Sequence, residues 1–446
     1  MTLIKADALD PSFFAPRTFA SDVRSAAQHI LDEVKQNGDA ALHEFAKKFD
    51  RADPDSFEIP YADLKECENN LRKNKTSVYD ALCRSRDLAL KFAYKQKECF
   101  TDFEIELTDG LFTGQKNIPV ERAGLYVPAG SFPLLSSVVM TSSPAKAAGC
   151  KEIILCTPPK ARAKTGRSEK RTPWADEGIL AAASICSVGR VFAVGGAQAI
   201  AAMAYGTQSV PRCDVIAGPG NKYVAEAKRL ITGDAGIDLV AGPTEVFIIA
   251  DKDAKAEWVA ADLLAQAEHD ADAQAVLATP SKAFAEKVNK ELEKRLAALP
   301  TAQTAAESIK RHGLIIITDS LEQAADIANR KAPEHLELAL NEGKKRDEIA
   351  ALLHNYGSLF IGCFAAEVLG DYAAGLNHTL PTSGSARFTG GLSVRHFLKT
   401  ATTLRTAENK AELPKGVKDS FKAAFELGKA EGLYAHARAA DVRLQS

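Results

Sequence analysis

Gln266 and His269 stand three residues apart in the stretch ADLLAQAEHD. Apolar residues recur there at spacings of three and four, which predicts a helix from Ala261 to His269. Residues three apart share a helix face, so the amide oxygen and the imidazole can hold a cation or a polar ligand together. Two polar residues on a solvated face would give the same pattern. The Gln266–His269 pair indicates a binding site only if other segments of the chain supply further ligand residues.

A carboxylate and an imidazole lie side by side at Glu334 and His335, directly after Pro333. Because proline interrupts the preceding helical pattern, the pair is predicted at the entrance of a strand. Histidine titrates near neutral pH, and a neighbouring carboxylate can share its proton transfers. The pair is therefore a candidate acid–base group, with a charged pair at a strand edge as the alternative interpretation.

Two glycine-rich turns are candidate anion sites. The segments GGAQ at 195–198 and GPGN at 218–221 each follow an apolar strand pattern and precede a helical one. Backbone amides in such a turn, together with the helix N-terminus, favour a phosphate. Neither segment matches GxGxxG, and an ordinary strand–helix turn would explain either alone. Since the turns occur in successive units, each with an amide side chain, we favour a ligand edge at the carboxyl ends of the strands.

A third group of polar residues lies in the glycine- and proline-rich stretch 370–382. The stretch has little regular pattern, so Asp371, Asn377 and His378 are predicted on a loop, where functional residues concentrate. His436 lies near the end of the last predicted helix, a position that a cation favours on electrostatic grounds alone.

The elements that must position these residues follow an alternating pattern. Short apolar strands are predicted at 123–127, 153–156, 190–194 and 215–217, and a second set at 246–250, 275–278, 314–317 and 358–361. Alanine-rich helical patterns separate them, including 255–268, 281–297 and 320–330 in the second set. Such alternation is typical of parallel sheets covered by helices, and it predicts two α/β units with a boundary near Gly242.

The flanking segments have other patterns. Residues 19–100 are predicted to be helical, and a hairpin is predicted at 103–113 around an Asp-Gly turn. After Gly384 the pattern gives way to glycine-rich loops and one final helix at 417–439. This tail contains too few regular elements to enclose a hydrophobic core of its own. We therefore expect it to pack on another part of the assembly, such as another subunit. The basic stretch 158–173 is predicted to be a solvated loop.

The composition excludes several classes of protein. Lys and Arg number 56 against 58 Asp and Glu, so no basic footprint for nucleic acid is present. No apolar run approaches the ~18 residues of a membrane span, and the N-terminus lacks a signal-peptide pattern. The eight cysteines form no CxxC pair and are expected as reduced thiols. A cytoplasmic protein that binds neither nucleic acid nor membrane is expected.

Nine motifs, in order from about residue 20 to the C-terminus, together resemble the histidinol dehydrogenase family. They are YVPAG at 126–130, GGAQAI at 195–200, GPGN at 218–221, AGPTE at 241–245, QAEH at 266–269, PEHLE at 333–337, GDY at 370–372, NHTLPT at 377–382 and EGLYAH at 431–436. The resemblance implies a zinc- and NAD-dependent enzyme that oxidises L-histidinol to L-histidine through L-histidinal, with two NAD+, in the last steps of histidine biosynthesis.

The resemblance also implies an architecture: two incomplete Rossmann-like α/β domains, an N-terminal helical segment and a C-terminal dimerisation tail. The implied divisions are 1–120, a helical region joining the second α/β unit; 121–243, the NAD-binding unit; 244–383, the unit with zinc and catalytic residues; and 384–446, the tail. In this family the tail crosses to the partner of a homodimer, so each active site would be shared.

Carried over by position, the resemblance assigns individual roles. The zinc ligands would be Gln266, His269, Asp371 and His436, the last from the other subunit, and the catalytic pair would be Glu334 and His335. The NAD contacts would be Tyr126, Gln198 and Asn221. The further substrate contacts would be Thr244, His378 and Glu431. The zinc ligands and His335 would contact substrate as well. The residue types suit the chemistry, with His335 as the base for the hydroxyl proton and Glu334 as the base that activates water for aldehyde hydration.

One departure keeps alternatives open. Thr244 stands where the family usually has serine, and the extra methyl group narrows the pocket beside the substrate. Relatives that resemble sulfopropanediol dehydrogenase use much the same zinc and base residues on another small alcohol. A zinc hydrolase, with Glu334 activating a metal-bound water, is the alternative from another class, and the paired glycine turns count against it. A non-catalytic metal-binding protein is made improbable by the Glu334–His335 pair.

Overall fold

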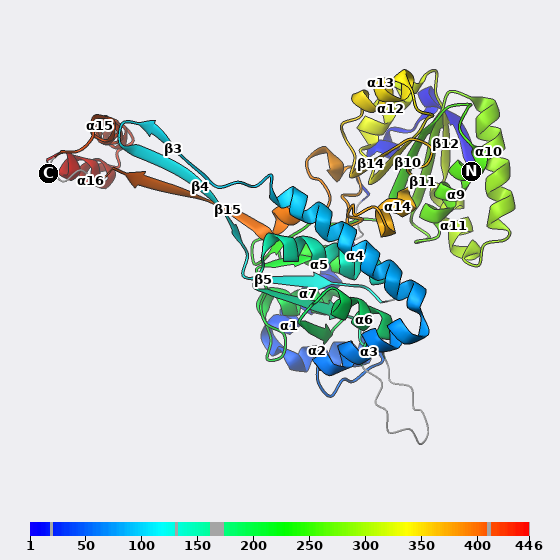
Figure 1. Cartoon of the computed structure of the whole chain (residues 1–446), viewed down its shortest axis with the longest axis horizontal. Coiled ribbons are helices and arrows are strands. Elements are labelled where there is room, and N and C mark those ends of the chain that lie inside the picture. The colour runs from blue at the N-terminus through cyan, green and yellow to red at the C-terminus, as the bar shows by residue number, and fades with distance from the viewer. Residues whose placement is uncertain (18–20, 130–132, 161–173, 408–411, 446) are drawn as a thin grey trace. The chain divides into compact units, whose positions relative to one another are not determined.

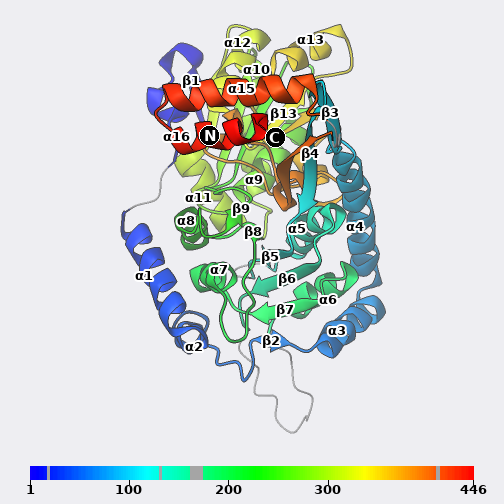
Figure 2. The ribbon, with the colours of Figure 1, turned by 90° about the vertical axis from the view of Figure 1, so that its left-hand side faces the viewer.

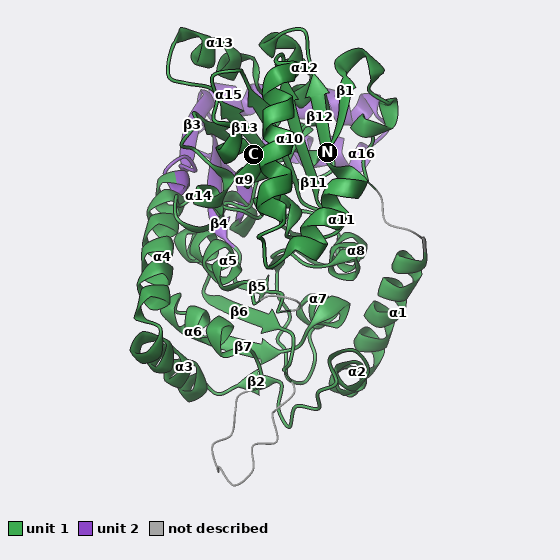
Figure 3. Cartoon of the chain, turned by 90° about the vertical axis from the view of Figure 1, so that its right-hand side faces the viewer, with its two compact units in different colours: residues 1–95, 120–397 green, residues 96–119, 398–446 purple. Residues whose placement is uncertain are grey.

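The computed structural model describes residues 1–17, 21–129, 133–160, 174–407 and 412–445, so most of the predicted basic loop lies outside the described residues. The chain divides into two compact units (Figure 3). The first unit comprises residues 1–95 and 120–397, and the second comprises residues 96–119 and 398–446. No helix within the described ranges is long and apolar enough to cross a bilayer.

The first unit contains two six-stranded sheets, which define its first and second halves. The sheet of the first half has the order β2-β7-β6-β5-β8-β9, and all neighbours are parallel except β2 on β7. Its strands are β2 (Glu58–Ile59), β5 (Arg122–Tyr126), β6 (Glu152–Thr157), β7 (Arg190–Ala193), β8 (Val215–Ala217) and β9 (Gly236–Ile237). Helices α7 (Gly196–Tyr205) and α8 (Lys222–Leu230) lie on one side, and α5 (Leu135–Ala148) and α6 (Glu177–Ile185) on the other (Figure 2).

The sheet of the second half is parallel throughout, in the order β1-β12-β11-β10-β13-β14. Strands β10, β11, β12 and β14 of this sheet are labelled in Figure 1. Its strands are β1 (Thr2–Lys5), β10 (Glu245–Ala250), β11 (Gln274–Thr279), β12 (Leu314–Ile317), β13 (His335–Ala339) and β14 (Ser358–Ile361). On β10, Val246 and Ile248 enter a core with α9 (Ala256–Ala267), α10 (Lys282–Leu296) and α11 (Ala302–His312). Phe247 and Ile249 enter the opposite core with α12 (Leu321–Lys331) and α13 (Lys344–Leu352). Both faces of β10 are therefore buried, which explains why its sequence from Val246 to Ala250 is continuously apolar. The predicted α/β class is confirmed, and the strands predicted at 246–250, 275–278, 314–317 and 358–361 correspond to β10, β11, β12 and β14.

The N-terminal residues contribute to both halves. Strand β1, which the sequence did not predict, pairs with β12 in the second half. The predicted helical region is confirmed as α1 (Ser21–Asn37), α2 (Asp39–Phe45), a π-helical turn η3 (Ala46–Asp50), α3 (Tyr61–Asn74) and α4 (Thr76–Lys97). Helix α1 packs against α7 and α8, and α3 against α6, so these helices complete the first half.

The second unit is a three-stranded antiparallel sheet with two helices. The predicted hairpin is confirmed as β3 (Phe103–Thr108) and β4 (Leu111–Pro119). Strand β15 (Leu398–Thr406) pairs along β4, so the prediction of loops there was wrong. The predicted single final helix was also wrong: α15 (Lys415–Ala430) and α16 (Tyr434–Leu444) are separated at Gly432, which has φ +73. A left-handed glycine ends a helix in this way.

Candidate active site

The predicted acid–base pair, Glu334 and His335, lies at the amino end of β13, beside the amino end of the neighbouring strand β10. His335 is the first residue of β13 and pairs in register with Val246 of β10. Thr244 directly precedes β10, and Glu245 begins it. The predicted position at a strand entrance is confirmed, and strand pairing brings two distant segments of sequence together at one edge.

Glu334 is held by two hydrogen bonds from the neighbouring segment. The Thr244 hydroxyl donates to Glu334 Oε2 at 2.5 Å, and the Glu245 amide donates to the same oxygen at 2.9 Å. Burial nevertheless raises the pKa of the Glu334 carboxyl to about 8, against these two hydrogen bonds and with the negative charges of Glu245 and Asp371 adding to the rise. A carboxyl group with a pKa near the working pH can act as a base and as an acid.

His335 presents one free ring nitrogen. Its Nδ1 lies 3.3 Å from the carbonyl oxygen of Glu245 and can donate a proton to it. Its Nε2 has no hydrogen-bond partner among the described residues and lies 3.7 Å from Asp371 Oδ1. Burial lowers the pKa of His335 to about 3, so the ring is neutral at physiological pH. With Nδ1 donating, the lone pair of Nε2 is available to accept a proton.

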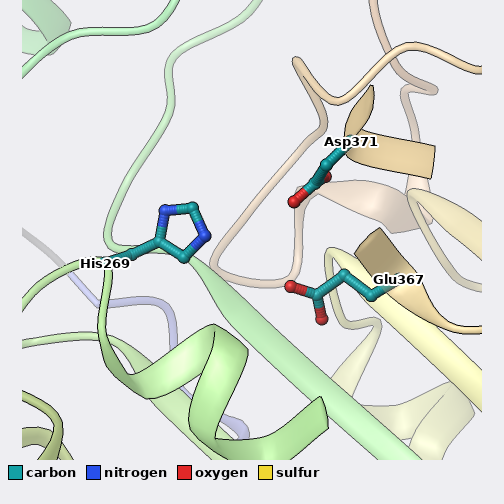
Figure 4. Close-up of side chains that lie close together, drawn as sticks. All are labelled: His269, Glu367 and Asp371. Atoms are coloured by element: carbon teal, nitrogen blue, oxygen red, sulfur yellow. The ribbon is translucent and has the colours of Figure 1, made fainter. Parts of the chain in front are cut away.

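A candidate metal cluster is formed by His269, Glu367 and Asp371, whose potential ligand atoms all lie within 4.8 Å of one another. Helix α14 (Glu367–Tyr372) carries both carboxylates, and His269 follows α9. Figure 4 shows the imidazole and the two carboxylates directed toward a common space. The sequence predicted His269 and Asp371 but missed Glu367. The available signal was spacing, since Glu367 precedes Asp371 by one helical turn.

Two local predictions around this cluster were wrong. Helix α9 ends at Ala267, so His269 lies beyond it rather than on its face. The Asp270 side chain accepts from the Asp272 amide at 2.8 Å, a turn that competes with helix continuation. Asp371 lies on α14 rather than on a loop, because the Glu367 amide at the start of that helix donates to the buried Glu337 side chain at 2.7 Å. Sequence periodicity does not report such a tertiary contact.

Gln266 is fully buried and linked to the Glu334–His335 pair through Thr244. Its Nε2 donates to the Thr244 hydroxyl at 2.9 Å, so a chain of hydrogen bonds runs from Gln266 through Thr244 to Glu334. Its Oε1 is buried and has no hydrogen-bond partner within the described part of the chain. An unpaired buried amide oxygen is unfavourable unless it meets a donor or a cation. An amide oxygen, an imidazole and carboxylates form a donor set that suits Zn²⁺.

The second half is tied to the first by the segment after α14. Asn377 Nδ2 donates to the carbonyl oxygen of Met140 on α5 at 2.7 Å. His378 Nε2 lies 3.3 Å from Ser137 Oγ on the same helix, and burial lowers the pKa of His378 to about 4. The irregular conformation predicted for these two residues is confirmed. A neutral imidazole is thereby fixed between the two halves.

The predicted cofactor contacts lie at the carboxyl ends of strands in the first half. The Tyr126 hydroxyl accepts from the Gly196 amide at 3.0 Å, and the Asn221 side chain caps α8 by accepting from the Tyr223 and Val224 amides. Gly218 has φ +128, and a Cβ there would lie 2.1 Å from the Tyr126 carbonyl oxygen. Only glycine permits this approach.

A hollow of about 1060 Å³ is bordered by the predicted cofactor contacts and by His269 of the predicted metal site. Tyr126, Gln198 and Asn221 line it from the first half, and His269 and Tyr372 from the second half. Residues predicted for a dinucleotide and for a metal therefore border one continuous space. This volume is slightly above the range of about 300–1,000 Å³ that is usual for ligand and cofactor sites.

Glu431 and His436 belong to the second unit. Glu431 follows the last turn of α15, and His436 lies in the first turn of α16. Their roles at the active site remain predictions.

Comparisons with known proteins agree over the whole length. The family model for histidinol dehydrogenase matches residues 15–444. Histidinol dehydrogenase of Aromatoleum aromaticum is 41% identical over 452 residues, covering 99% of this chain and 97% of the relative. Histidinol dehydrogenase of Bacillus cereus strain ATCC 10987 is 41% identical, covering 95% and 93%. The crystal structure of histidinol dehydrogenase from Elizabethkingia anophelis has a TM-score of 0.87 at 33% identity, covering 100% of this chain and 98% of that one.

Proposed function

The chain belongs to the histidinol dehydrogenase family of NAD-dependent oxidoreductases, and we propose that it oxidises L-histidinol through L-histidinal to L-histidine, with two NAD+, in the last steps of histidine biosynthesis. The observation that carries the proposal is the hollow, which the predicted cofactor contacts and the metal-cluster residue His269 line together. Oxidation of an alcohol needs both a hydride acceptor and a proton acceptor near one carbon. The predicted cofactor contacts line the hollow, and His335 Nε2 lies 3.7 Å from Asp371 Oδ1, which belongs to the same cluster as His269.

The two catalytic residues act in succession. His335 Nε2 accepts the hydroxyl proton of the alcohol, because the ring is neutral and its Nδ1 is engaged with the Glu245 carbonyl group. Glu334 then removes a proton from water, so that the aldehyde is hydrated before its own oxidation. The Gln266–Thr244 chain orients the Glu334 carboxylate for this step. Thr244, which replaces the usual serine, keeps the necessary hydroxyl group.

A zinc ion would be held by Gln266, His269 and Asp371, with His436 of a partner subunit. The unpaired Gln266 Oε1 and the converging His269 and Asp371 side chains support the fit. Burial raises the pKa of Asp371 to about 7 and that of Glu367 well above its ordinary value, so a cation would compensate clustered carboxylates. When bound, zinc supplies an anchor for the imidazole and amine of the substrate, and NAD supplies the hydride acceptor. Orientation by several fixed groups accelerates reaction.

A homodimer with shared sites is supported by exposed apolar side chains in both units. On β3, Phe103, Ile105 and Leu107 are 49%, 51% and 60% exposed. Beside the metal cluster, Phe364 and Tyr372 are exposed as well. Large exposed apolar side chains mark interaction surfaces. We therefore propose that the second unit covers the site of a second copy and contributes Glu431 and His436.

Mixing two inactive variants tests this sharing. In a heterodimer of a His436→Ala chain and a His269→Ala chain, one site has both native histidines and the other has neither. Random pairing should restore about a quarter of the sites, measured as histidinol-dependent NADH formation after co-refolding. Mixing His269→Ala with Gln266→Ala is the control and should restore nothing, since both residues belong to the same unit. Absence of recovery in the first mixture would show that each site is built within one chain.

Steady-state NAD reduction with histidinol and with a sulfonated diol tests the substrate. Turnover of histidinol alone is expected, and turnover of the diol alone would favour the sulfopropanediol alternative. The family membership favours neither this alternative nor the zinc hydrolase. The zinc hydrolase alternative predicts that the protein hydrolyses its substrate in the absence of NAD.

A further inference from the structure

Asp50 lines the same hollow but has no role in the proposed reaction. Its neighbours in the lining include Ala26, Ile30, Phe49 and Tyr126, which belong to the N-terminal helices and the first half. The buried Asp50 Oδ2 has no hydrogen-bond partner among the residues that the structure describes. Because Asp50 borders a cofactor-sized space and its buried Oδ2 has no donor among the described residues, its carboxylate is a candidate ligand contact.

The backbone fixes this side chain in place. Asp50 ends the π-helical turn η3, in which the Arg51 amide donates to the Ala46 carbonyl oxygen, and Arg51 itself is left-handed with φ 53. The Phe45 and Phe49 rings stack at 5.6 Å between centroids, which anchors the turn against the core. π-helical turns interrupt regular helices and are frequent at functional sites.

The surroundings of Asp50 differ from those of the nearby Asp53. Asp53 is 55% exposed and lies 3.2 Å from Lys47 Nζ and 3.3 Å from His43 Nδ1. Burial is the cause that raises the pKa of Asp50 to about 6. Asp53 thus has its partners within the protein, whereas Asp50 lines the hollow and its Oδ2 has no partner among the described residues.

We propose that the Asp50 carboxylate accepts hydrogen bonds from the ribose diol of the adenosine half of NAD and disfavours the 2′-phosphate of NADP. The inference rests on the proposed use of the hollow by NAD. The metal cluster fixes the reacting end of the cofactor near His269, and Asp50 belongs to the other group of lining residues, with Tyr126. Apolar Ala26, Ile30 and Phe49 in that group suit a heteroaromatic base. A diol supplies two donors, whereas a phosphate would place negative charge against the carboxylate.

Asp50→Asn and Asp50→Ser test the proposal against the matched control Asp53→Asn. Dissociation constants for NAD and NADP would be measured by calorimetry, and kcat/KM for both cofactors at fixed histidinol concentration. Each Asp50 variant should reduce the preference for NAD over NADP by about tenfold or more, through weaker NAD binding and tighter NADP binding. Asp53→Asn removes the same charge three residues away and should leave the preference within about twofold.

The two levels of failure are distinguishable. An unchanged preference in Asp50 variants that melt at the wild-type temperature would overturn the role of Asp50. An equal change of the NAD preference in Asp53→Asn would also overturn the role of Asp50. It would show that the preference arises from the overall negative charge of this segment. A wild-type protein that binds NAD but does not oxidise histidinol would refute the proposed reaction, while the calorimetric preference would still decide the role of Asp50.

Discussion

Replacing His335 by asparagine is expected to slow oxidation of histidinol by about 10²- to 10⁴-fold, the usual contribution of a general base. Asparagine can still donate to the Glu245 carbonyl group, as His335 Nδ1 does, but it offers no basic nitrogen in place of Nε2. The bound zinc should remain, because His335 is not among the proposed ligands. Single-turnover NADH formation and metal analysis on the same sample measure both quantities.

His354→Asn is the control for this prediction. His354 is exposed, and among the described residues its ring has a hydrogen-bond contact only with the nearby Leu352 carbonyl group. It should leave the rate and the metal content unchanged. A His335→Asn enzyme that oxidises histidinol at nearly the wild-type rate would exclude His335 as the base. Loss of zinc in parallel with activity would indicate a structural role instead.

Replacing Glu334 by glutamine is expected to slow oxidation of histidinal by about 10²-fold or more while affecting oxidation of histidinol less. Only the ionised carboxylate can take a proton from water, and burial raises the pKa of Glu334 to about 8. The ionised fraction therefore increases as pH rises from about 6 to about 9, so the histidinal step should accelerate over this range in the wild-type enzyme. In Glu334→Gln this acceleration should be absent.

Separate rate measurements with histidinol and histidinal across this pH range check the prediction. Glutamine keeps the size of the side chain and can still accept from the Thr244 hydroxyl and the Glu245 amide. His335→Asn provides the opposite selectivity and serves as the comparison. Equal loss in the two steps, or an unchanged pH profile in the variant, would contradict the role of Glu334 in water activation.

The fold was predictable where local sequence and tertiary environment agree. The run from Val246 to Ala250 is apolar throughout because both faces of β10 are buried, and its assignment was correct. Strand β15 was missed because its threonine-rich sequence is half-exposed and gains its structure by pairing along β4. The break between α15 and α16 depends on the conformation of Gly432, which periodicity does not report.

The site was predictable mainly as residue types in motifs. The structure places four of the predicted residues close together, namely Glu334, His335, His269 and Asp371. The folding of β13 and α14 is what brings these residues to one place. The hydrogen-bond chain from Gln266 through Thr244 to Glu334 could not be predicted. It joins three segments that are distant in sequence, and it depends on how β10 and β13 pair. Glu367 was missed because a carboxylate one turn from Asp371 resembles any polar helix residue until its burial is known.

Metal dependence of histidinol oxidation tests the central claim most directly. The purified chain should contain about one zinc ion per active site and form NADH when histidinol is added. Removal of zinc by a chelator should abolish NADH formation in proportion to the metal lost, and added zinc should restore it. Full turnover by metal-free protein, or no turnover of histidinol by the zinc-loaded protein, would contradict the account.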